Sequence, residues 1–246
     1  VNIRGGILTR RPAIFDVPNA ADHFTWNSWH MSGIERKAVK DGFSFYIPLR
    51  YSELPGYYRN CIKSLDVAMF QVTPMDKHGY FNFGLSASHL RAVIEKSKVV
   101  IVEVNENMPR CLGGFDNCIH ISEVDMIVEG RNDPMGIQPS NPATDVDKAV
   151  AKLIVEQIPN GACLQLGIGG MPNALGALIA DSELKDLGMH TELCSDGYLA
   201  MFKAGKLTNR RKTLLPGKGV LGLAIGSREF YDWVDDNPGL AGYPLS

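Results

Sequence analysis

The sequence predicts an α/β fold composed of two three-layer domains. Short apolar runs of strand length alternate with helical segments through both halves of the chain, the pattern of layered α/β packing. A stretch rich in Pro, Gly and Asn over residues 130–143 separates the two halves and has the composition of a linker. We therefore expect one domain over residues 1–135 and a second over residues 136–246.

In the first half, residues 1 to about 30 show no clear period. Beyond them, the strand 65–72, the helix 86–97 beginning at a Ser, and the strand 98–104 predict a right-handed parallel crossover. The loop 71–81 follows a strand end, where it is either a ligand-binding loop or a plain connection. The other expected elements are a helix over 32–42, a strand over 43–50 and a helical turn over 52–60.

The second half opens with a helix over 144–158, because Thr144 and Asp147 form a capping box at its start. Its apolar stripe consists of Val146, Val150, Leu153 and Ile154. Strands and helices then alternate to the end, with Pro172 in a first helical turn, where proline is tolerated. The expected strands are 161–166, 189–194 and 219–226, and the expected helices are 171–180, 198–205 and 227–234.

Composition excludes several classes of protein. The 246 residues include 45% hydrophobic and 21% charged residues, as in ordinary globular proteins. The net charge is −2 and basic residues are scattered, so we expect no nucleic-acid partner. Apolar runs such as 99–104 are far shorter than the roughly 20 residues of a membrane helix, so we expect no membrane partner.

Five cysteines without a pairing pattern indicate a cytoplasmic chain with reduced thiols. Cys111, Cys118 and His120 are the one combination that suggests a metal. Their spacing lacks the CxxC signature of zinc sites, so no metal is expected.

The run from Leu164 to Gly197 resembles the outline of a dinucleotide-binding unit. Gly167 and Gly169 fit the G-x-G-x-x-G fingerprint, but Pro172 stands where the third glycine belongs. In that interpretation Glu192 would hold a ribose. Alternatively, the turn presents backbone amides to a phosphate, carboxylate or oxyanion at a helix N-terminus, or it is an ordinary glycine-rich turn.

Glu192 lies near the end of a predicted strand, where α/β sheets bind ligands, and the turn Ser195-Asp196-Gly197 follows it. Asp196 either acts on Glu192 electrostatically or caps the next helix. The simplest alternative is that Glu192 is a surface residue with Asp196 as the cap.

Several separate motifs recur in one order and resemble the acetyl-CoA hydrolase/transferase family of class I CoA-transferases. In the second half they are "GACLQLGIGGMPNALGAL", "DLGMHTELCSDG", "LTNRRKTLLPGK" and "AIGSREFYDWVDDNP"; in the first half they include "DVAMFQVTPMDKHGYFNFG" and "VNENMPR". The resemblance covers roughly residues 30 to 246 and is strongest to 4-hydroxybutyrate and butyryl-CoA:acetate CoA-transferases. It implies two Rossmann-like three-layer α/β domains of the CoA-transferase type, the second incomplete in this chain.

The resemblance also implies a catalytic site. Glu192 matches the family's nucleophile, which forms a glutamyl-CoA thioester with the substrate. The family's glycine loop lines the CoA thioester and donates an amide to the oxyanion; it matches Ile168, Gly169, Gly170, Met171, Pro172 and Asn173. The implied function is an acyl-CoA:carboxylate CoA-transferase of the acetate, butyrate or 4-hydroxybutyrate class, with CoA as substrate and without a bound cofactor.

Two alternatives to this function stay open. An acyl-CoA hydrolase on the same fold would differ only in the access of water, and a nucleotide-binding domain would lack catalysis. We also expect a homo-oligomer. The family's chains continue past the segment that matches "VDDNP" with a second glycine-rich loop, so we expect this sequence to be a portion of a longer chain.

Overall fold

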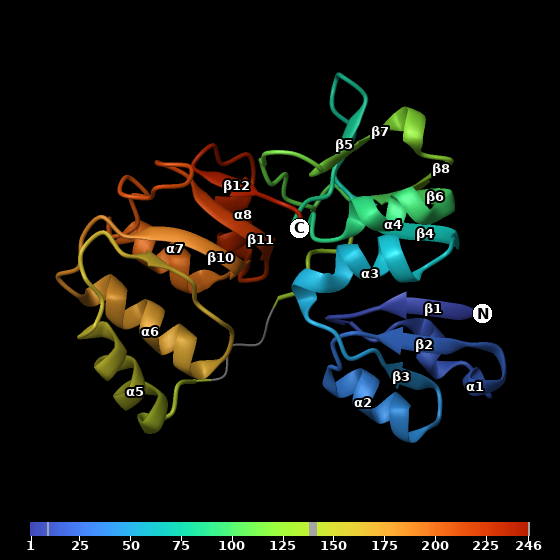
Figure 1. Ribbon diagram of the computed structural model, residues 1–246, viewed down its shortest axis with the longest axis horizontal. Helices are drawn as coiled ribbons and strands as arrows, with labels where there is room; N and C mark the ends of the chain where they lie inside the picture. The colour runs from blue at the N-terminus through green and yellow to red at the C-terminus, as the bar shows by residue number, and fades with distance from the viewer. Residues whose placement is uncertain (9, 138–141, 246) are drawn as a thin grey trace. The chain divides into compact units, whose positions relative to one another are not determined.

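The computed structural model describes residues 1–8, 10–137 and 142–245 (Figure 1). By its internal contacts the chain divides into two compact units, Val1–Leu54 and Pro55–Leu245. The predicted linker 130–143 lies inside the second unit, and its residues 138–141 fall outside the described ones. The predicted domain boundary, between residues 135 and 136, differs from this division, which falls between Leu54 and Pro55. That boundary stays a prediction.

The first unit contains a small parallel sheet, which the sequence did not reveal apart from its third strand. The order β1-β2-β3 is formed by Asn2–Gly5, Thr25–Ser28 and Ser44–Tyr46. The predicted helix is α2 (Gly33–Lys40), and it ends before Gly42, whose φ of +73° is readily adopted by glycine. Short helical turns precede β2 at Ala13–Asp16 (η1) and Ala20–His23 (α1).

Glu35 links the cap of α2 to the core of this unit. Its carboxylate accepts hydrogen bonds from the Ser32 amide (2.6 Å) and the Ser28 hydroxyl (2.7 Å), and from the Trp26 indole (3.4 Å). The side chain is fully buried, so these donors replace the water that a carboxylate requires. Trp26 packs in the hydrophobic core of this unit with the aromatic rings of Phe15 and Phe43.

The second unit begins with a parallel sheet of order β4-β6-β8. Strands β4 (Leu65–Val72) and β6 (Ser97–Val104) match the two predicted apolar runs, and β8 (Met126–Glu129) was not predicted. Helices α3 (Leu54–Cys61) and α4 (Leu90–Lys96) connect to these strands, with the 3-10 turn η2 (Tyr51–Glu53) before α3. Beyond them, β5 (Tyr80–Asn82) pairs antiparallel with β7 (Cys118–His120), which leads into η3 (Ile121–Glu123).

Helix α4 begins four residues later than predicted, and the backbone explains why. Ser86 forms an isolated bridge with Leu223, and Ser88 has a φ of +39°. Neither conformation fits an α-helix, so the Ser that reads as a helix start belongs to an extended connection.

His89, directly before α4, gives this region a pH-dependent stability. Its ring stacks on Tyr58 (5.4 Å between centroids), and its Nδ1 lies 2.9 Å from the Ser88 hydroxyl. Burial lowers the pKa of His89 from 6.5 to about 4.

Between pH 6.5 and about 4, His89 is protonated in the unfolded chain but stays neutral in the folded protein. Its contribution to the free energy of unfolding is therefore retained above pH 6.5 and lost as the pH falls towards 4. The loss contributed by His89 is about 3 kcal/mol at most. Urea unfolding between about pH 4.5 and 7 should show a flatter dependence for His89→Gln than for the wild type. Equal slopes for wild type and His89→Gln would contradict this assignment.

The second sheet of this unit has four parallel strands in the order β12-β11-β10-β9. The strands are Leu240–Gly242, Gly219–Ala224, Gly188–Cys194 and Cys163–Leu164. Its helices are α5 (Asp145–Val155), α6 (Gly170–Asp181), α7 (Asp196–Lys203) and α8 (Arg228–Val234). The predicted strands and helices are confirmed except that β9 is only two residues long, and β12 was not predicted. The predicted α/β class with parallel sheets is confirmed.

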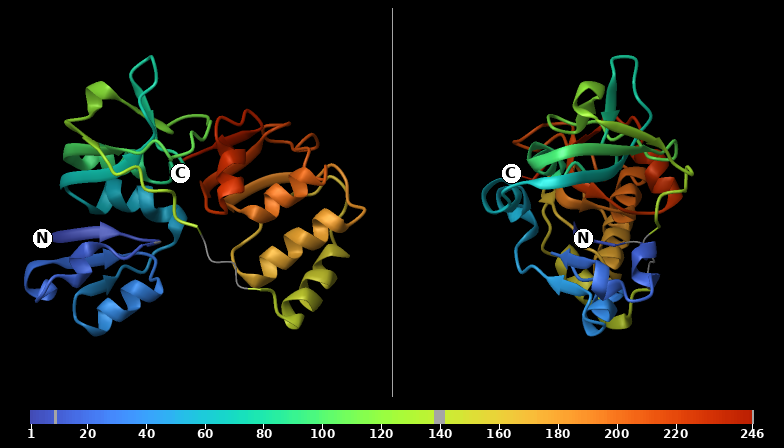
Figure 2. Two further views of the ribbon diagram at one scale, coloured as in Figure 1. Left: turned by 180° about the vertical axis from the view of Figure 1, so that it is seen from behind. Right: turned by 90° about the vertical axis from the view of Figure 1, so that its right-hand side faces the viewer.

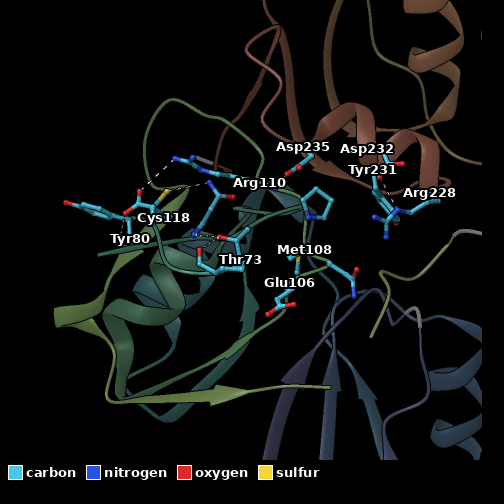
Figure 3. Close-up of a pocket in the computed structure, with 15 residues that line it drawn as sticks. Thr73, Tyr80, Glu106, Met108, Arg110, Cys118, Arg228, Tyr231, Asp232 and Asp235 are labelled. Carbon is cyan, nitrogen blue, oxygen red and sulfur yellow. Dashed lines mark hydrogen bonds and ion pairs between the residues drawn. The ribbon is translucent and has the colours of Figure 1, made fainter. Parts of the chain in front are cut away.

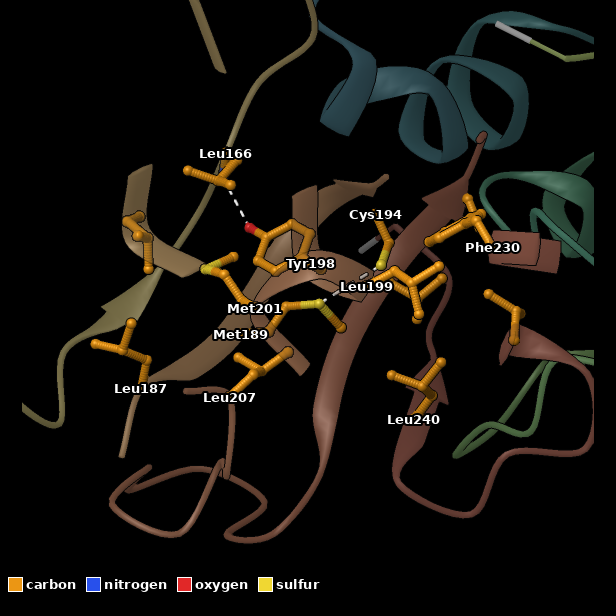
Figure 4. Packing of buried hydrophobic residues seen from close by; sticks show 14 of the residues in the cluster. Leu166, Leu187, Met189, Cys194, Tyr198, Leu199, Met201, Leu207, Phe230 and Leu240 are labelled. Carbon is orange, nitrogen blue, oxygen red and sulfur yellow. Dashed lines mark hydrogen bonds between the residues drawn. The ribbon is translucent and has the colours of Figure 1, made fainter. Parts of the chain in front are cut away.

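The core of this second sheet is formed by side chains of β10, β11, α6 and α7 (Figure 4). Met189, Tyr198, Met201 and Ile179 are fully buried in it. The predicted capping box of α5 is confirmed, with the Asp147 amide donating to the Thr144 hydroxyl. Its apolar stripe, however, is largely not the buried face. Ala151 is fully buried and Ile154 packs on the core, whereas Val146 (72%), Val150 (40%) and Leu153 (65%) are exposed.

Candidate functional site

The glycine loop between β9 and α6 is held in place by a buried tyrosine. The Tyr198 hydroxyl accepts a hydrogen bond from the Leu166 amide (2.7 Å) and donates to the Leu164 carbonyl (3.3 Å) (Figure 4). Burial raises the pKa of Tyr198 well above its usual value, so the hydroxyl stays protonated. Since Tyr198 lies on α7, this helix fixes the strand from which the loop departs.

Gly169 has a backbone conformation that requires glycine. Its φ of +114° and ψ of −174° lie in a region that side chains exclude, although a Cβ here would meet open space. Gly169 is the N-cap of α6 and, as a glycine, makes no side-chain capping hydrogen bond. The amide end of a 12-residue helix therefore opens towards the loop, an arrangement that favours negative charge.

Glu192 lies on β10, two residues before the strand ends, and its side chain is exposed. On the neighbouring strand β11, Gly222 lies beside it, where an added Cβ would be 3.1 Å from the Glu192 backbone carbonyl oxygen. Within the described parts of the chain, no hydrogen bond or ion pair occupies the Glu192 carboxylate. The residue that the sequence singled out is thus solvent-accessible and unpaired among the described residues.

The glycine loop and the turn after β10 line a common pocket of about 550 Å³, which we call the loop pocket. Its lining includes Ile168, Gly169 and Asn173 of the glycine loop and α6, and Ser195, Asp196 and Ser227 from the turns after β10 and β11. The pocket lies at the carboxyl ends of β9, β10 and β11, where parallel sheets bind ligands. Gly170, Met171 and Pro172 begin α6 but do not line it, nor does Glu192 itself.

Asp196 does not cap the helix that follows it. It is the first residue of α7, whose N-cap Ser195 makes no side-chain capping bond. Instead its carboxylate accepts hydrogen bonds from the amide (2.9 Å) and hydroxyl (2.5 Å) of Ser227. The Ser227 hydroxyl in turn accepts a hydrogen bond from the Phe230 amide at the start of α8. Sequence reasoning missed Ser227, although its place just after β11 is the same ligand-binding edge.

A second pocket, of about 330 Å³, lies outside the glycine loop, and we call it the α8 pocket (Figure 3). The loop after β4 contributes Thr73 and Asp76, and α8 contributes Arg228 and Tyr231. Arg110 also lines it, where its side chain lies 3.9 Å from Asp76. The loop 71–81 therefore does line a pocket. That this loop binds a ligand stays a prediction.

The third glycine of the dinucleotide fingerprint has no counterpart at Pro172, but close helix packing occurs elsewhere. Helices α6 and α7 lie side by side (Figures 1 and 2), and Gly176 packs directly against Gly197. The sequence thus fits the fingerprint only in part, because α6, the helix after the glycine loop, packs closely on α7 at Gly176 and not at position 172.

Among the described residues, no group of three or more His, Cys, Asp or Glu side chains could hold a metal ion. Cys111 is buried and Cys118 half-buried, and both are free thiols. Over the same residues, every helix is too short or too polar to cross a bilayer.

The family model and the relatives that this chain matches agree on one family. Residues 15–139 match the family model described as the acetyl-CoA hydrolase/transferase N-terminal domain. The chain is 60% identical over its whole length to a butyryl-CoA:acetate CoA-transferase of Anaerostipes caccae, covering 55% of that protein. It is 40% identical over 91% of its length to a 4-hydroxybutyrate coenzyme A transferase of Clostridium kluyveri, covering 51% of it.

Among solved structures, RipA from Yersinia pestis superposes with a TM-score of 0.84 at 33% identity. The match covers 92% of this chain and 53% of RipA. The chain thus spans about half the length of the curated relatives it matches.

Proposed function

The chain belongs to the acetyl-CoA hydrolase/transferase family, and from this premise we propose that the protein is an acyl-CoA:carboxylate CoA-transferase. It moves CoA between short-chain acyl groups of the acetate, butyrate or 4-hydroxybutyrate class. The observation that carries the proposal is the arrangement of Glu192 and the glycine loop. Glu192, exposed and without a hydrogen-bond partner among the described residues, and a glycine loop with Gly169 as its helix N-cap stand at the ends of neighbouring parallel strands, in a chain 60% identical to a butyryl-CoA:acetate CoA-transferase.

In the proposed mechanism, a Glu192 carboxylate oxygen attacks the thioester carbonyl carbon of the acyl-CoA. The C–S bond breaks, leaving an acyl-glutamyl anhydride and the CoA thiolate. The thiolate then attacks the glutamyl carbonyl, which releases the first carboxylate and leaves a glutamyl-CoA thioester. An acceptor carboxylate repeats these steps in reverse, so the thioester energy is conserved without ATP.

A carboxylate is a weak nucleophile, so the oxyanion that forms on the thioester must be stabilised. We assign this role to the loop of Ile168, Gly169 and Gly170, with Met171, Pro172 and Asn173 completing the CoA-binding segment. The support is that the N-cap of α6 is Gly169, which has no side chain with which to cover the amide end of the helix.

We further propose that the two domains are residues 1–135 and 136–246. The family model ends at residue 139, and the strands on the two sides of this point belong to separate sheets, which supports the boundary. A cytoplasmic location accords with the free cysteines. A homo-oligomer would give the exposed apolar stripe of α5 a partner.

An acceptor assay tests the function. Incubating the protein with acetyl-CoA and butyrate should yield butyryl-CoA and acetate, with the total thioester unchanged. The release of free thiol without a new thioester would identify a hydrolase. If neither product forms although acetyl-CoA binds, the protein is a binding domain and the transferase assignment is wrong. Repeating the assay with 4-hydroxybutyrate then ranks the acceptors.

A further inference from the structure

The turn after β11 is joined to the start of α7 by a side-chain bridge that extends the sheet. The backbone pairing of β10 and β11 continues to the Ile225 amide, which donates to the Cys194 carbonyl (3.0 Å). Two residues further along each strand, Asp196 receives both hydrogen-bond donors of Ser227, its amide and its hydroxyl. Beyond the last backbone hydrogen bond, this bridge therefore connects the two strand ends.

The bridge lies in the wall of the loop pocket. Asp196, Ile225 and Ser227 all line that pocket, as do Ile168 and Gly169 of the glycine loop. Gly226 allows the approach, because a Cβ there would lie 2.9 Å from an Asp196 carboxylate oxygen and 2.5 Å from the Phe230 ring. Without the carboxylate, the turn 225–227 would lose two of the bonds that fix its distance from α7.

A second bond from α8 reaches another wall of the same pocket. The Tyr231 hydroxyl donates to the Gly136 carbonyl, next to Ile137, which also lines the loop pocket. Helix α8 thus connects, through Ser227 and Tyr231, to two separate segments around this pocket.

We propose that Asp196 is a positioning residue that, through Ser227, fixes the width of the loop pocket and so sets its affinity for acyl-CoA. The proposal rests on the transferase function proposed above. The Asp196 carboxylate touches no reacting atom in this account. It acts by holding Ser227 and Ile225 at the distance from the glycine loop that the substrate requires.

Steady-state kinetics of the full encoded protein distinguish a positioning role of Asp196 from a general loss of stability. Asp196→Ala should raise KM for acyl-CoA about 10-fold, as expected for lost bonds to a charged group, with kcat within about two-fold of the wild type. Ser227→Ala should have a smaller effect, because the Ser227 amide keeps its acceptor. In the double variant the effects should be less than additive, since both changes break one bridge. A lower kcat at unchanged KM would instead indicate a merely structural role and overturn the proposal.

Hydrogen exchange tests the bridge independently of activity. In Asp196→Ala, amides of residues 225–231 should exchange faster than in the wild type. Asp181→Asn, at the exposed C-terminal end of α6, is the matched control and should change neither exchange nor KM. Unchanged exchange in Asp196→Ala overturns the proposal. If the wild type exchanges no CoA at all, the proposed function fails, and the exchange rates alone still decide whether the bridge orders this turn.

Discussion

Replacing Glu192 with Gln is expected to reduce CoA transfer by roughly 10⁶-fold while leaving the fold intact. The amide has nearly the same shape as the carboxylate but lacks the negative oxygen that attacks the thioester. Because the side chain is exposed and makes no hydrogen bond within the described residues, its replacement breaks no structural contact. The thermal midpoint should therefore stay that of the wild type.

Glu183→Gln is the matched control, because it is the same substitution at an exposed position shortly before β10. It should keep full activity. Glu192→Asp should also lose most of its activity, since the shorter side chain withdraws the nucleophile by about one bond length from the thioester. Full transferase activity in Glu192→Gln would remove Glu192 from the mechanism.

Trapping should show the covalent intermediate on the same residue. Treating the wild type with acyl-CoA and then borohydride reduces a glutamyl-CoA thioester to an alcohol, which peptide mass spectrometry can locate. We expect the modification on Glu192 and no modification in Glu192→Gln. A modified carboxylate elsewhere in the chain would reassign the nucleophile.

The long regular elements of the chain could be predicted because their signals are local. Strands β4 and β6 are eight residues each, mostly apolar, and α5 carries a complete capping box. The missed strands β1, β2 and β12 have three or four residues, too few to show a period. They form because a neighbouring strand supplies hydrogen bonds, and that information is not local to their own sequence.

The residues of the candidate site likewise divide into those that local sequence patterns identify and those that they do not. Gly169 and Glu192 could be found from sequence, because a glycine at a strand–helix turn and an acid near a strand end are local patterns. The hydrogen bonds that Asp196 accepts from Ser227 join residues 31 apart in sequence, whereas the sequence interpretations of Asp196, as a helix cap or an electrostatic neighbour of Glu192, were both local. The exposed stripe of α5 shows the opposite error, in which a clear amphipathic pattern does not identify the face that is buried here.

The contact between α6 and α7 sets the distance between the two halves of the candidate site. Helix α6 begins at the glycine loop, and α7 begins four residues after Glu192. Where the helices meet, a Cβ added to Gly176 would lie 2.8 Å from the Gly197 Cα, closer than real Cβ atoms approach. The neighbouring atom is backbone, so it cannot move aside as the end of a side chain would.

Gly176→Ala is therefore expected to separate the two helices. Alanine in a helix interior gains up to about 1 kcal/mol over glycine, but overpacking of this kind typically costs about 1–3 kcal/mol, so the net effect should be destabilising. The displacement also moves the glycine loop away from Glu192, and an error of about 1 Å in such geometry can reduce turnover on the order of 10²-fold. Thermal unfolding and the acetyl-CoA–butyrate assay measure the two effects.

Gly197→Ala is the matched control for this contact. A Cβ on Gly197 would meet Leu166 at 3.5 Å and the Gly176 Cα at 3.6 Å, which are ordinary packing distances. The same substitution on the facing helix should therefore be tolerated and gain a few tenths of a kcal/mol from helix propensity. The asymmetry is the decisive result, because both variants add one methyl group to one interface. If Gly176→Ala is as stable and active as Gly197→Ala, the close approach of α6 and α7 does not fix the site.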